Sequence, residues 1–209
     1  MLIIGAKGFA KEVLEIFHQK DETQNLHFYD DVSADIADYL YEKFKILKNE
    51  DNARALFENH PEFTLGIGNP QLRSELSEKF QNLGGKLTSS ISKFAEIGSF
   101  GVEIGKGCNI LGGAKISNDA KIGQGTIIYY NSIITHDVVV GDFSEISPGA
   151  TLLGRCEIGK FVKIGAGAII FPDVKIGDYS VIASGAVVRN DIPANCMAAG
   201  VPAEIKKTF

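Results

Sequence analysis

The sequence predicts a mixed fold: a small α/β domain over residues 1–88, followed over residues 89–209 by a parallel β-helix of hexapeptide repeats. Two observations carry this prediction. Strand-like and helix-like segments alternate in the first part, which indicates a small parallel sheet. In the second part an aliphatic residue recurs every six positions, a period that fits neither an amphipathic helix nor a coiled coil.

The first part contains three strand-like and three helix-like segments. We expect strands in MLIIG, LHFYDD and FTLGIGNP, and helices in FAKEVLEIF, DNARALFENH and QLRSELSEKFQNLGG. The last helix has clear boundaries, with Asn69 as N-cap, Pro70 at the first helical position and Gly84–Gly85 as the stop. The alternation predicts a Rossmann-like sheet, about half the size of a full dinucleotide-binding fold.

The hexapeptide repeats run without a gap, and two sets of positions mark them. The aliphatic positions are Ile104, Ile110, Ile116, Ile122, Ile128, Ile134, Val140, Ile146, Leu152, Ile158, Ile164, Ile170, Ile176, Ile182 and Val188, with Ile91 and Ile97 before them after a one-residue slip. Four residues after each come Cys108, Ala114, Ala120, Thr126, Ser132, Val138, Ser144, Ala150, Cys156, Val162, Ala168, Val174, Ser180 and Ala186. Both sets should point inward. Three repeats make one triangular coil, and coils stack about 4.8 Å apart, so residues eighteen apart form a column.

Composition narrows the class of protein. The chain has 209 residues, is 44% hydrophobic and carries a net charge of −5. No basic block stands out, so nucleic acid is not an expected partner. No apolar run approaches the roughly 20 residues that span a bilayer, so we expect no membrane insertion. The opening MLIIGAKG meets glycine after four residues, which argues against a signal peptide and for a cytoplasmic location.

The three cysteines, Cys108, Cys156 and Cys196, lack the spacing of zinc ligands. An odd count without a secretion signal indicates reduced thiols. Cys108 and Cys156 occupy small positions of the repeat, so we expect inert thiols in the core. No cluster of histidine and carboxylate residues accompanies them, so we expect no metal.

One histidine of the repeat region is a candidate for chemistry. His136 lies two residues after Ile134, in a turn, and its column is Asn118, His136, Gly154 and Pro172. The glycine leaves room for a ligand and bares a backbone N–H that can hold an oxyanion. Asp137 follows, in the column Asp119, Asp137, Arg155 and Asp173. It can orient His136 or pair with Arg155, and His136 itself can be an ordinary polar turn residue.

The segment GAKGFA, between the first strand and the first helix, suggests an anion site. Its spacing is G-x-x-G-x-A rather than G-x-G-x-x-G, so a full dinucleotide site is not indicated. A glycine-rich turn before a helix suits the diphosphate of a nucleotide sugar. Arg73, near the helix start at Asn69–Pro70, offers a second anion site. The alternative is that this part is a purely structural cap on the β-helix.

Several stretches together resemble one family. They are IIGAKGFAKEV, YDD, GIGNPQLR, SIITHDVVVGDFSEISPGATLLGRCEIG and AAGVPAEI, and they cover nearly the whole chain. The sequence resembles the hexapeptide-repeat sugar acyltransferases typified by sialic-acid O-acetyltransferase and the bacillosamine-pathway UDP-amino-sugar N-acetyltransferases. The resemblance implies a left-handed β-helix and a homotrimer with active sites between subunits. It also implies transfer of an acetyl group from acetyl-CoA to the 4-amino group of a nucleotide-linked 4-amino-4,6-dideoxy sugar.

The resemblance also assigns roles to residues. His136 falls on the catalytic base and Asp137 on its acidic neighbour, where relatives often have glutamate. Acetyl-CoA contacts are implied at Gly154, Ala166 and Ser184. Nucleotide-sugar contacts are implied at Lys7, Gly8, Phe9, Asp30, Asp31 and Gly68.

One position departs from the family pattern. Some relatives have a second histidine that touches acetyl-CoA where this sequence has Glu145. The residue one coil further on is Lys163, so we expect an exposed Glu145–Lys163 contact worth at most about 1 kcal/mol. The contribution of Glu145 to cofactor binding stays open.

These residues suggest direct transfer, in which the sugar amine attacks the thioester while His136 takes the proton, because imidazole titrates near neutral pH. An acyl-cysteine at Cys156 is not expected, because its register points into the core. O-acetylation of a sugar or sialic-acid hydroxyl is the alternative within the same class. A non-catalytic hexapeptide protein is a further alternative. A carbonic-anhydrase relative would need about three histidine ligands near the turns, where this sequence has one.

Overall fold

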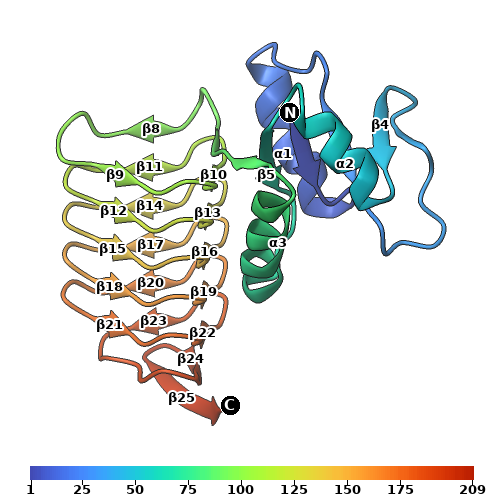
Figure 1. Cartoon of the computed structure of the whole chain (residues 1–209). Coiled ribbons are helices and arrows are strands. Elements are labelled where there is room, and N and C mark those ends of the chain that lie inside the picture. The colour runs from blue at the N-terminus through green and yellow to red at the C-terminus, as the bar shows by residue number, and fades with distance from the viewer.

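The computed structural model describes all residues, 1–209, and shows an α/β part beside a β-helix (Figure 1). The α/β part has one sheet in the order β3-β4-β2-β1-β5-β6. Its strands are β1 (Leu2–Ile4), β2 (His27–Tyr29), β3 (Tyr39–Leu40), β4 (Phe44–Leu47), β5 (Glu62–Leu65) and β6 (Lys86–Leu87). Its helices are α1 (Gly8–Gln19), α2 (Glu50–Phe57) and α3 (Pro70–Asn82). All three predicted strands and all three predicted helices are present.

The prediction of a small parallel sheet is incomplete. The strands β4 and β6 extend the sheet in parallel, and β3 pairs antiparallel with β4. These added strands are only two to four residues long, so they present too little alternation to be read from sequence.

The boundaries of α3 are as predicted. The Asn69 side chain accepts a hydrogen bond from the Leu72 N–H at 2.9 Å, and Pro70 takes the first helical position. The helix ends before Gly84, whose φ of +97° is easy for glycine and strained for other residues.

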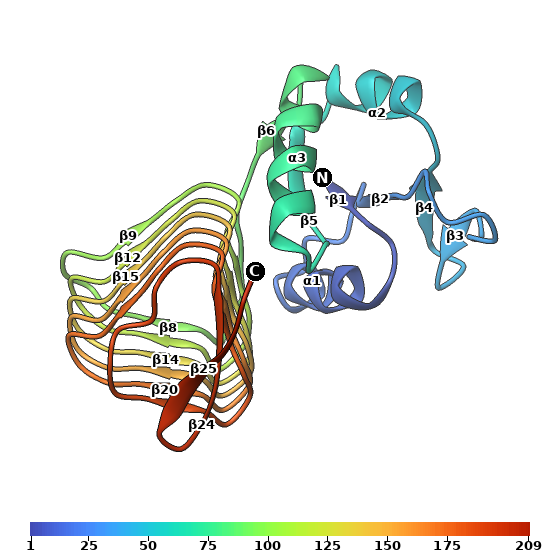
Figure 2. The ribbon, with the colours of Figure 1, turned by 90° about the horizontal axis from the view of Figure 1, so that it is seen from below.

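The β-helix has three faces. Face 1 holds β7 (Ser90–Ile91), β10 (Asn109–Ile110), β13 (Ile127–Ile128), β16 (Glu145–Ile146), β19 (Lys163–Ile164), β22 (Val181–Ile182), β24 (Cys196–Gly200) and β25 (Ala203–Thr208). Face 2 holds β8 (Glu96–Ile97), β11 (Lys115–Ile116), β14 (Ile133–Ile134), β17 (Thr151–Leu152), β20 (Ile169–Ile170) and β23 (Val187–Val188). Face 3 holds β9 (Glu103–Ile104), β12 (Lys121–Ile122), β15 (Val139–Val140), β18 (Glu157–Ile158) and β21 (Lys175–Ile176). Figure 2 shows the triangular cross-section, with α1 and α3 beside face 1.

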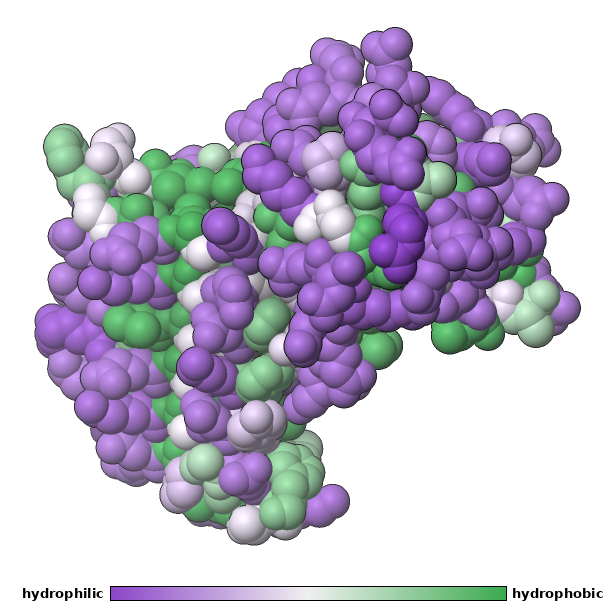
Figure 3. Space-filling view, viewed as in Figure 1, coloured by the Kyte–Doolittle hydropathy of each residue, from purple (hydrophilic) through white to green (hydrophobic).

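The six-residue register is confirmed. Strands of successive coils pair residues eighteen apart, as in Ile116 with Ile134. Before Ile104 the spacing is nineteen, as in Ile97 with Ile116, which confirms the one-residue slip. Every aliphatic position from Ile110 to Val188 is buried, and so is every small position from Cys108 to Ala186. Hydrophobic atoms show at the surface in Figure 3 as a strip that runs down the β-helix.

The cysteines are in the core, as predicted for two of them. Cys108 and Cys156 are fully buried, and Cys196 is buried too. Burial raises the pKa of the Cys108 thiol to about 11 and that of Cys156 to about 12. Cys108 and Cys156 therefore stay protonated at neutral pH, and because all three thiols are buried, none is placed to act as a nucleophile.

Two polar residues join the α/β part to face 1. Asn109 accepts a hydrogen bond from Thr64 Oγ1 at 2.9 Å and donates one to the Leu65 carbonyl at 2.6 Å. Arg73, on α3, donates hydrogen bonds to carbonyls in the turns between faces 3 and 1. Because these bonds are buried, they fix how the two parts sit against each other. No helix of the structure has the length and apolar character needed to cross a membrane.

Candidate active site

His136 and Asp137 lie in the turn from face 2 to face 3, after β14. Both side chains are more than half exposed, and His136 Nδ1 lies 2.7 Å from Asp137 Oδ2. With the carboxylate ionised, Nδ1 carries the proton and donates, so Nε2 is left free to accept one. The backbone of Asp137 has a φ of +59°, a left-handed conformation that aspartate tolerates better than most residues. This turn therefore favours Asp137 on backbone grounds as well.

Gly154 lies directly beside the imidazole, as the eighteen-residue column predicts. A Cβ at this position would stand 2.7 Å from His136 Cε1 and 2.9 Å from Nε2. Only glycine allows the ring to lie where it does. The Gly154 carbonyl accepts a bond from the Asp173 N–H at 3.1 Å, and the Gly154 N–H makes no bond within the chain. A free backbone donor thus adjoins the histidine.

Arg155 does not take Asp137 away from the histidine. Its guanidinium forms a bidentate pair with Asp173, with Nε to Oδ1 at 2.7 Å and Nη2 to Oδ2 at 2.9 Å. The pKa of Asp173 is held below its usual range by this hydrogen bonding. Of the two contacts considered for Asp137, the structure shows the one with His136.

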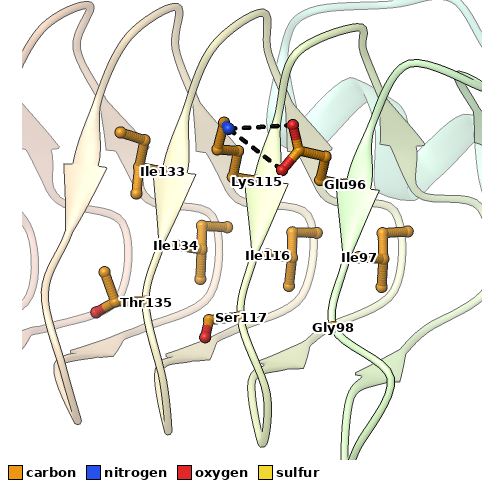
Figure 4. Close-up of a pocket in the computed structure, with 9 residues that line it drawn as sticks. All are labelled: Glu96, Ile97, Gly98, Lys115, Ile116, Ser117, Ile133, Ile134 and Thr135. Carbon is orange, nitrogen blue, oxygen red and sulfur yellow. Dashed lines mark hydrogen bonds and ion pairs between the residues drawn. The ribbon is translucent and has the colours of Figure 1, made fainter.

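A shallow cavity of about 370 Å³ lies on face 2, next to the histidine turn. Its lining residues come from β8, β11, β14 and the turns that follow them: Glu96, Ile97, Gly98, Lys115, Ile116, Ser117, Ile133, Ile134 and Thr135. Figure 4 shows Ile97, Ile116 and Ile134 in one row, with the Lys115–Glu96 ion pair at 3.0 Å beside them. The aliphatic groups and the exposed Ile133 make this floor partly apolar.

The residues implied in acetyl-CoA binding do not meet on one chain. Gly154 lies at the corner between faces 2 and 3, whereas Ala166 and Ser184 lie at the corner between faces 1 and 2. These corners are the two opposite edges of face 2. The corner with His136 is also the one that does not border face 1, where the α/β part sits (Figure 2). These residues therefore do not form one cluster on a single chain.

Glu145 and Lys163 pair as predicted, but the carboxylate is not exposed. Glu145 Oε2 lies 3.7 Å from Lys163 Nζ, and the Glu145 side chain is only 13% exposed. Ser147 Oγ donates to the other Glu145 oxygen at 3.2 Å. The expectation of an exposed pair is wrong because Glu145 lies on face 1, which the α/β part partly covers.

Lys7 and Gly8 line a cavity of about 380 Å³ at the start of α1, opposite Ser33 to Ala37. Phe9 turns away from it. Its ring lies against Tyr129 of the β-helix, with centroids 5.3 Å apart. Of the three residues of the glycine-rich loop, Lys7 and Gly8 thus border an open cavity, whereas Phe9 lies at the contact between the α/β part and the β-helix.

Asp30 and Asp31 follow β2 and differ in environment. Asp30 is buried, and its Oδ1 accepts bonds from the N–H groups of Val32 at 3.2 Å and Ser33 at 2.9 Å. These bonds shape the loop that borders the cavity. Asp31 is more exposed and accepts a bond from the Tyr29 hydroxyl at 2.9 Å.

The prediction that Arg73 forms an anion site is wrong. Arg73 is fully buried, and its donors go to backbone carbonyls: Gly68 at 2.7 Å, Gly125 at 3.0 Å, Phe143 at 2.6 Å, Ser144 at 3.1 Å and Ile67 at 3.5 Å. Burial lowers the pKa of Arg73 to about 10. Through Arg73, the helix start that suggested an anion site is instead hydrogen-bonded to the β-helix. Gly68 has open space around its Cα, with the Arg73 bond holding its carbonyl.

Sequence reasoning missed the residues that share a column with Ala166 and Ser184. Counting back by eighteen leads to Pro148 and then Tyr130, at the same corner. Tyr129 and Tyr130 are partly buried there against α1. The column itself is the signal that could have found them. No group of three or more histidine, cysteine or carboxylate side chains is placed to hold a metal ion.

Comparison with known proteins supports an N-terminal α/β domain followed by hexapeptide repeats. Residues 1–80 match the PglD N-terminal domain, and residues 119–154 and 155–190 each match the bacterial transferase hexapeptide (six repeats). A search of curated proteins returned no match.

Three solved structures are similar over almost the whole chain. A mutant of perosamine N-acetyltransferase from Caulobacter crescentus, in complex with CoA and GDP-perosamine, has a TM-score of 0.91 and 28% identity, and the match covers 99% of this chain and 96% of that one. The acetyltransferase domain of PglB from Neisseria gonorrhoeae, in complex with acetyl coenzyme A, has a TM-score of 0.90 and 27% identity, and the match covers 98% of this chain and 97% of that one. WeeI from Acinetobacter baumannii has a TM-score of 0.88 and 28% identity, and the match covers 98% of each chain.

The fold and the site define a left-handed β-helix transferase of the hexapeptide class, with a histidine–carboxylate pair at one corner. More specifically, the chain belongs to the hexapeptide-repeat sugar acyltransferases that carry a PglD-type N-terminal domain.

Proposed function

We propose that this protein transfers the acetyl group of acetyl-CoA to the 4-amino group of a nucleotide-linked 4-amino-4,6-dideoxy sugar. One observation carries the proposal: His136 bonds Asp137 at 2.7 Å and rests on the bare backbone of Gly154. The similar proteins support the substrate class, because one is a perosamine N-acetyltransferase complexed with CoA and GDP-perosamine. Another is an acetyltransferase domain complexed with acetyl coenzyme A.

His136 acts as the general base. Asp137 holds Nδ1 as a donor, so Nε2 accepts the proton that the sugar amine loses as its nitrogen attacks the thioester carbonyl. The Gly154 N–H donates to the carbonyl oxygen as negative charge develops on it. When the carbon–sulfur bond breaks, the proton on His136 passes to the departing thiolate. Acetyl-CoA supplies the acetyl group, and no covalent enzyme intermediate is needed.

The active sites lie between subunits of a homotrimer. In one chain His136 is at the corner remote from face 1, while the cavity at Lys7 and Gly8 lies within the α/β part. The site is completed when a second chain places its corner between faces 1 and 2, which holds Ala166 and Ser184, against the corner that holds His136.

The α/β part, residues 1–88, binds the nucleotide sugar. Lys7 supplies a positive charge and Gly8 an unobstructed backbone at the start of α1, an arrangement that suits a diphosphate. Asp30 shapes the loop opposite, and Asp31 presents a carboxylate next to it for ribose or base donors. Residues 89–209 carry the acetyl transfer.

A panel of UDP-, dTDP- and GDP-linked 4-amino sugars with acetyl-CoA tests the proposal, with CoA release as the readout. We expect release with at least one 4-amino sugar and an N-acetyl product by mass spectrometry. Release with 4-hydroxy sugars but none of the amino sugars would instead establish O-acetylation. No release with any acceptor would reject acetyl transfer to nucleotide sugars.

A further inference from the structure

One carboxylate at the seam between α1 and the β-helix has no partner. Oε2 of Glu12 is the single buried side-chain oxygen or nitrogen in the chain without a hydrogen bond. Native proteins satisfy nearly all such atoms, so each exception calls for an explanation. A carboxylate oxygen out of contact with water and without a donor is unfavourable unless something else binds it.

The position of Glu12 on α1 directs it at the β-helix. Glu12 lies between Phe9 and Ile16 on one side of the helix, at spacings of three and four residues. Phe9 lies against the Tyr129 ring, and Ile16 packs against buried Leu111. The carboxylate of Glu12 therefore faces the corner between faces 1 and 2.

Two tyrosines stand at that corner. The Tyr129 and Tyr130 rings are 6.4 Å apart, and both are partly buried. Burial raises the pKa of each hydroxyl, and the charge of Glu12 raises it further. Burial also raises the pKa of Glu12 itself. The charge of Glu12 thus reaches both phenols, and the three side chains form a cluster in which no basic side chain pairs with Glu12.

The cluster lies between the two ends of the proposed site. Tyr130, Pro148, Ala166 and Ser184 form one column, so Tyr130 is two coils, about 10 Å, from the position implied in acetyl-CoA binding. Glu12 is one helical turn from Gly8, which lines the cavity at the start of α1. Glu12 thus lies on the β-helix side of α1, one helical turn from the residue that lines the cavity and beside the tyrosine of the acetyl-CoA column.

We propose that Glu12 binds the amino group of the acceptor sugar, with Tyr129 and Tyr130 lining the sugar ring. This inference rests on the proposed function. The protonated amino group binds an unpaired carboxylate in a strong ion-paired hydrogen bond, and it releases one proton to solvent before its nitrogen attacks.

The test compares Glu12→Gln and Glu12→Ala with Glu78→Gln, which removes the same charge from an exposed position on α3. We expect the KM for the amino-sugar nucleotide to rise about tenfold or more in both Glu12 variants. The KM for acetyl-CoA should stay within twofold. The 4-hydroxy analogue, used as a competitive inhibitor, should bind the wild type and Glu12→Gln equally well. Glu78→Gln should match the wild type throughout.

An unchanged acceptor KM in both Glu12 variants overturns the inference while leaving the proposed function intact. Equal increases in the KM for acceptor and acetyl-CoA also overturn it, because they indicate a general disturbance. A wild type without activity on any amino-sugar nucleotide rejects the proposed function and this inference with it. Melting temperatures separate folding from binding, since loss of an unpaired carboxylate should not lower them.

Discussion

The imidazole of His136 occupies the space that any side chain at position 154 would need. A Cβ on Gly154 would lie 2.9 Å from Nε2, the nitrogen left free to accept a proton. The histidine and the glycine are therefore one structural unit, although a full coil separates them in sequence.

Gly154→Ala should displace the imidazole and lower kcat by about tenfold or more, because a shift of about 1 Å in a catalytic group is costly. Folding should change little, since His136 is more than half exposed and can move aside. Steady-state kinetics and a melting curve check this. The double variant Gly154→Ala/His136→Ala should be no slower than His136→Ala alone. Additive losses would show that Gly154 acts independently of the histidine.

His136→Ala should reduce kcat/KM by about 10² or more, the usual contribution of a general base. The melting temperature should hold, because the His136 side chain is more than half exposed. His18→Ala is the matched control, since His18 is an exposed histidine on α1 outside the site. Activity that survives in His136→Ala would remove the histidine from the mechanism.

Asp137→Asn should lower kcat/KM by about tenfold or more. The amide can present its NH₂ to Nδ1, which favours the tautomer with the proton on Nε2 and removes the base. Asp173→Asn makes the same change in the same column, where it breaks only the pair with Arg155. That control should be as active as the wild type. Equal losses in the two variants would show a general effect of the column's charge.

Arg73→Met should destabilise the protein by about 3 kcal/mol, because it leaves several buried carbonyls without a donor. Those of Gly125, Phe143 and Ser144 belong to the β-helix and that of Gly68 to the α/β part. Urea unfolding measures the loss, and Arg54→Met, at an exposed position of α2, is the control. A melting temperature equal to that of the wild type would contradict the role of Arg73 as a staple between the two parts.

Glu12→Gln should raise the melting temperature at pH 7 and not at pH 4. Burial raises the pKa of Glu12, so between the unfolded pKa of about 4.3 and the higher folded value the folded state binds more protons than the unfolded one. Stability of the wild type is therefore lost as pH rises through this window. The glutamine has no charge to bury. Melting curves at the two pH values check this, and an equal difference at both would contradict it.

The β-helix could be predicted almost completely from the sequence. The period of six is a local property, and burial of one aliphatic and one small residue per repeat follows from it directly. The same register placed His136 in a turn and Gly154 beside it. The short strands β3, β4 and β6 could not be predicted in this way, because their pairing depends on neighbours in the folded sheet.

The candidate site was predicted in part. Column arithmetic allowed two partners for Asp137, and side-chain geometry selected His136, since Arg155 is satisfied by Asp173. The interpretation of Arg73 as an anion ligand was wrong because the sequence places it at a helix start but does not show what packs on that helix. The exposure expected for Glu145 failed for the same reason.

The sequence by itself determined the repeat, the turn that carries the histidine, and the glycine beside it, because each is set by spacing along one chain. Only the tertiary structure decided what happens where α1 and α3 meet face 1. There Arg73 loses its access to solvent and Glu12 is left without a donor. Burial and hydrogen-bond partners depend on how two separately formed units pack, and no local pattern records that packing.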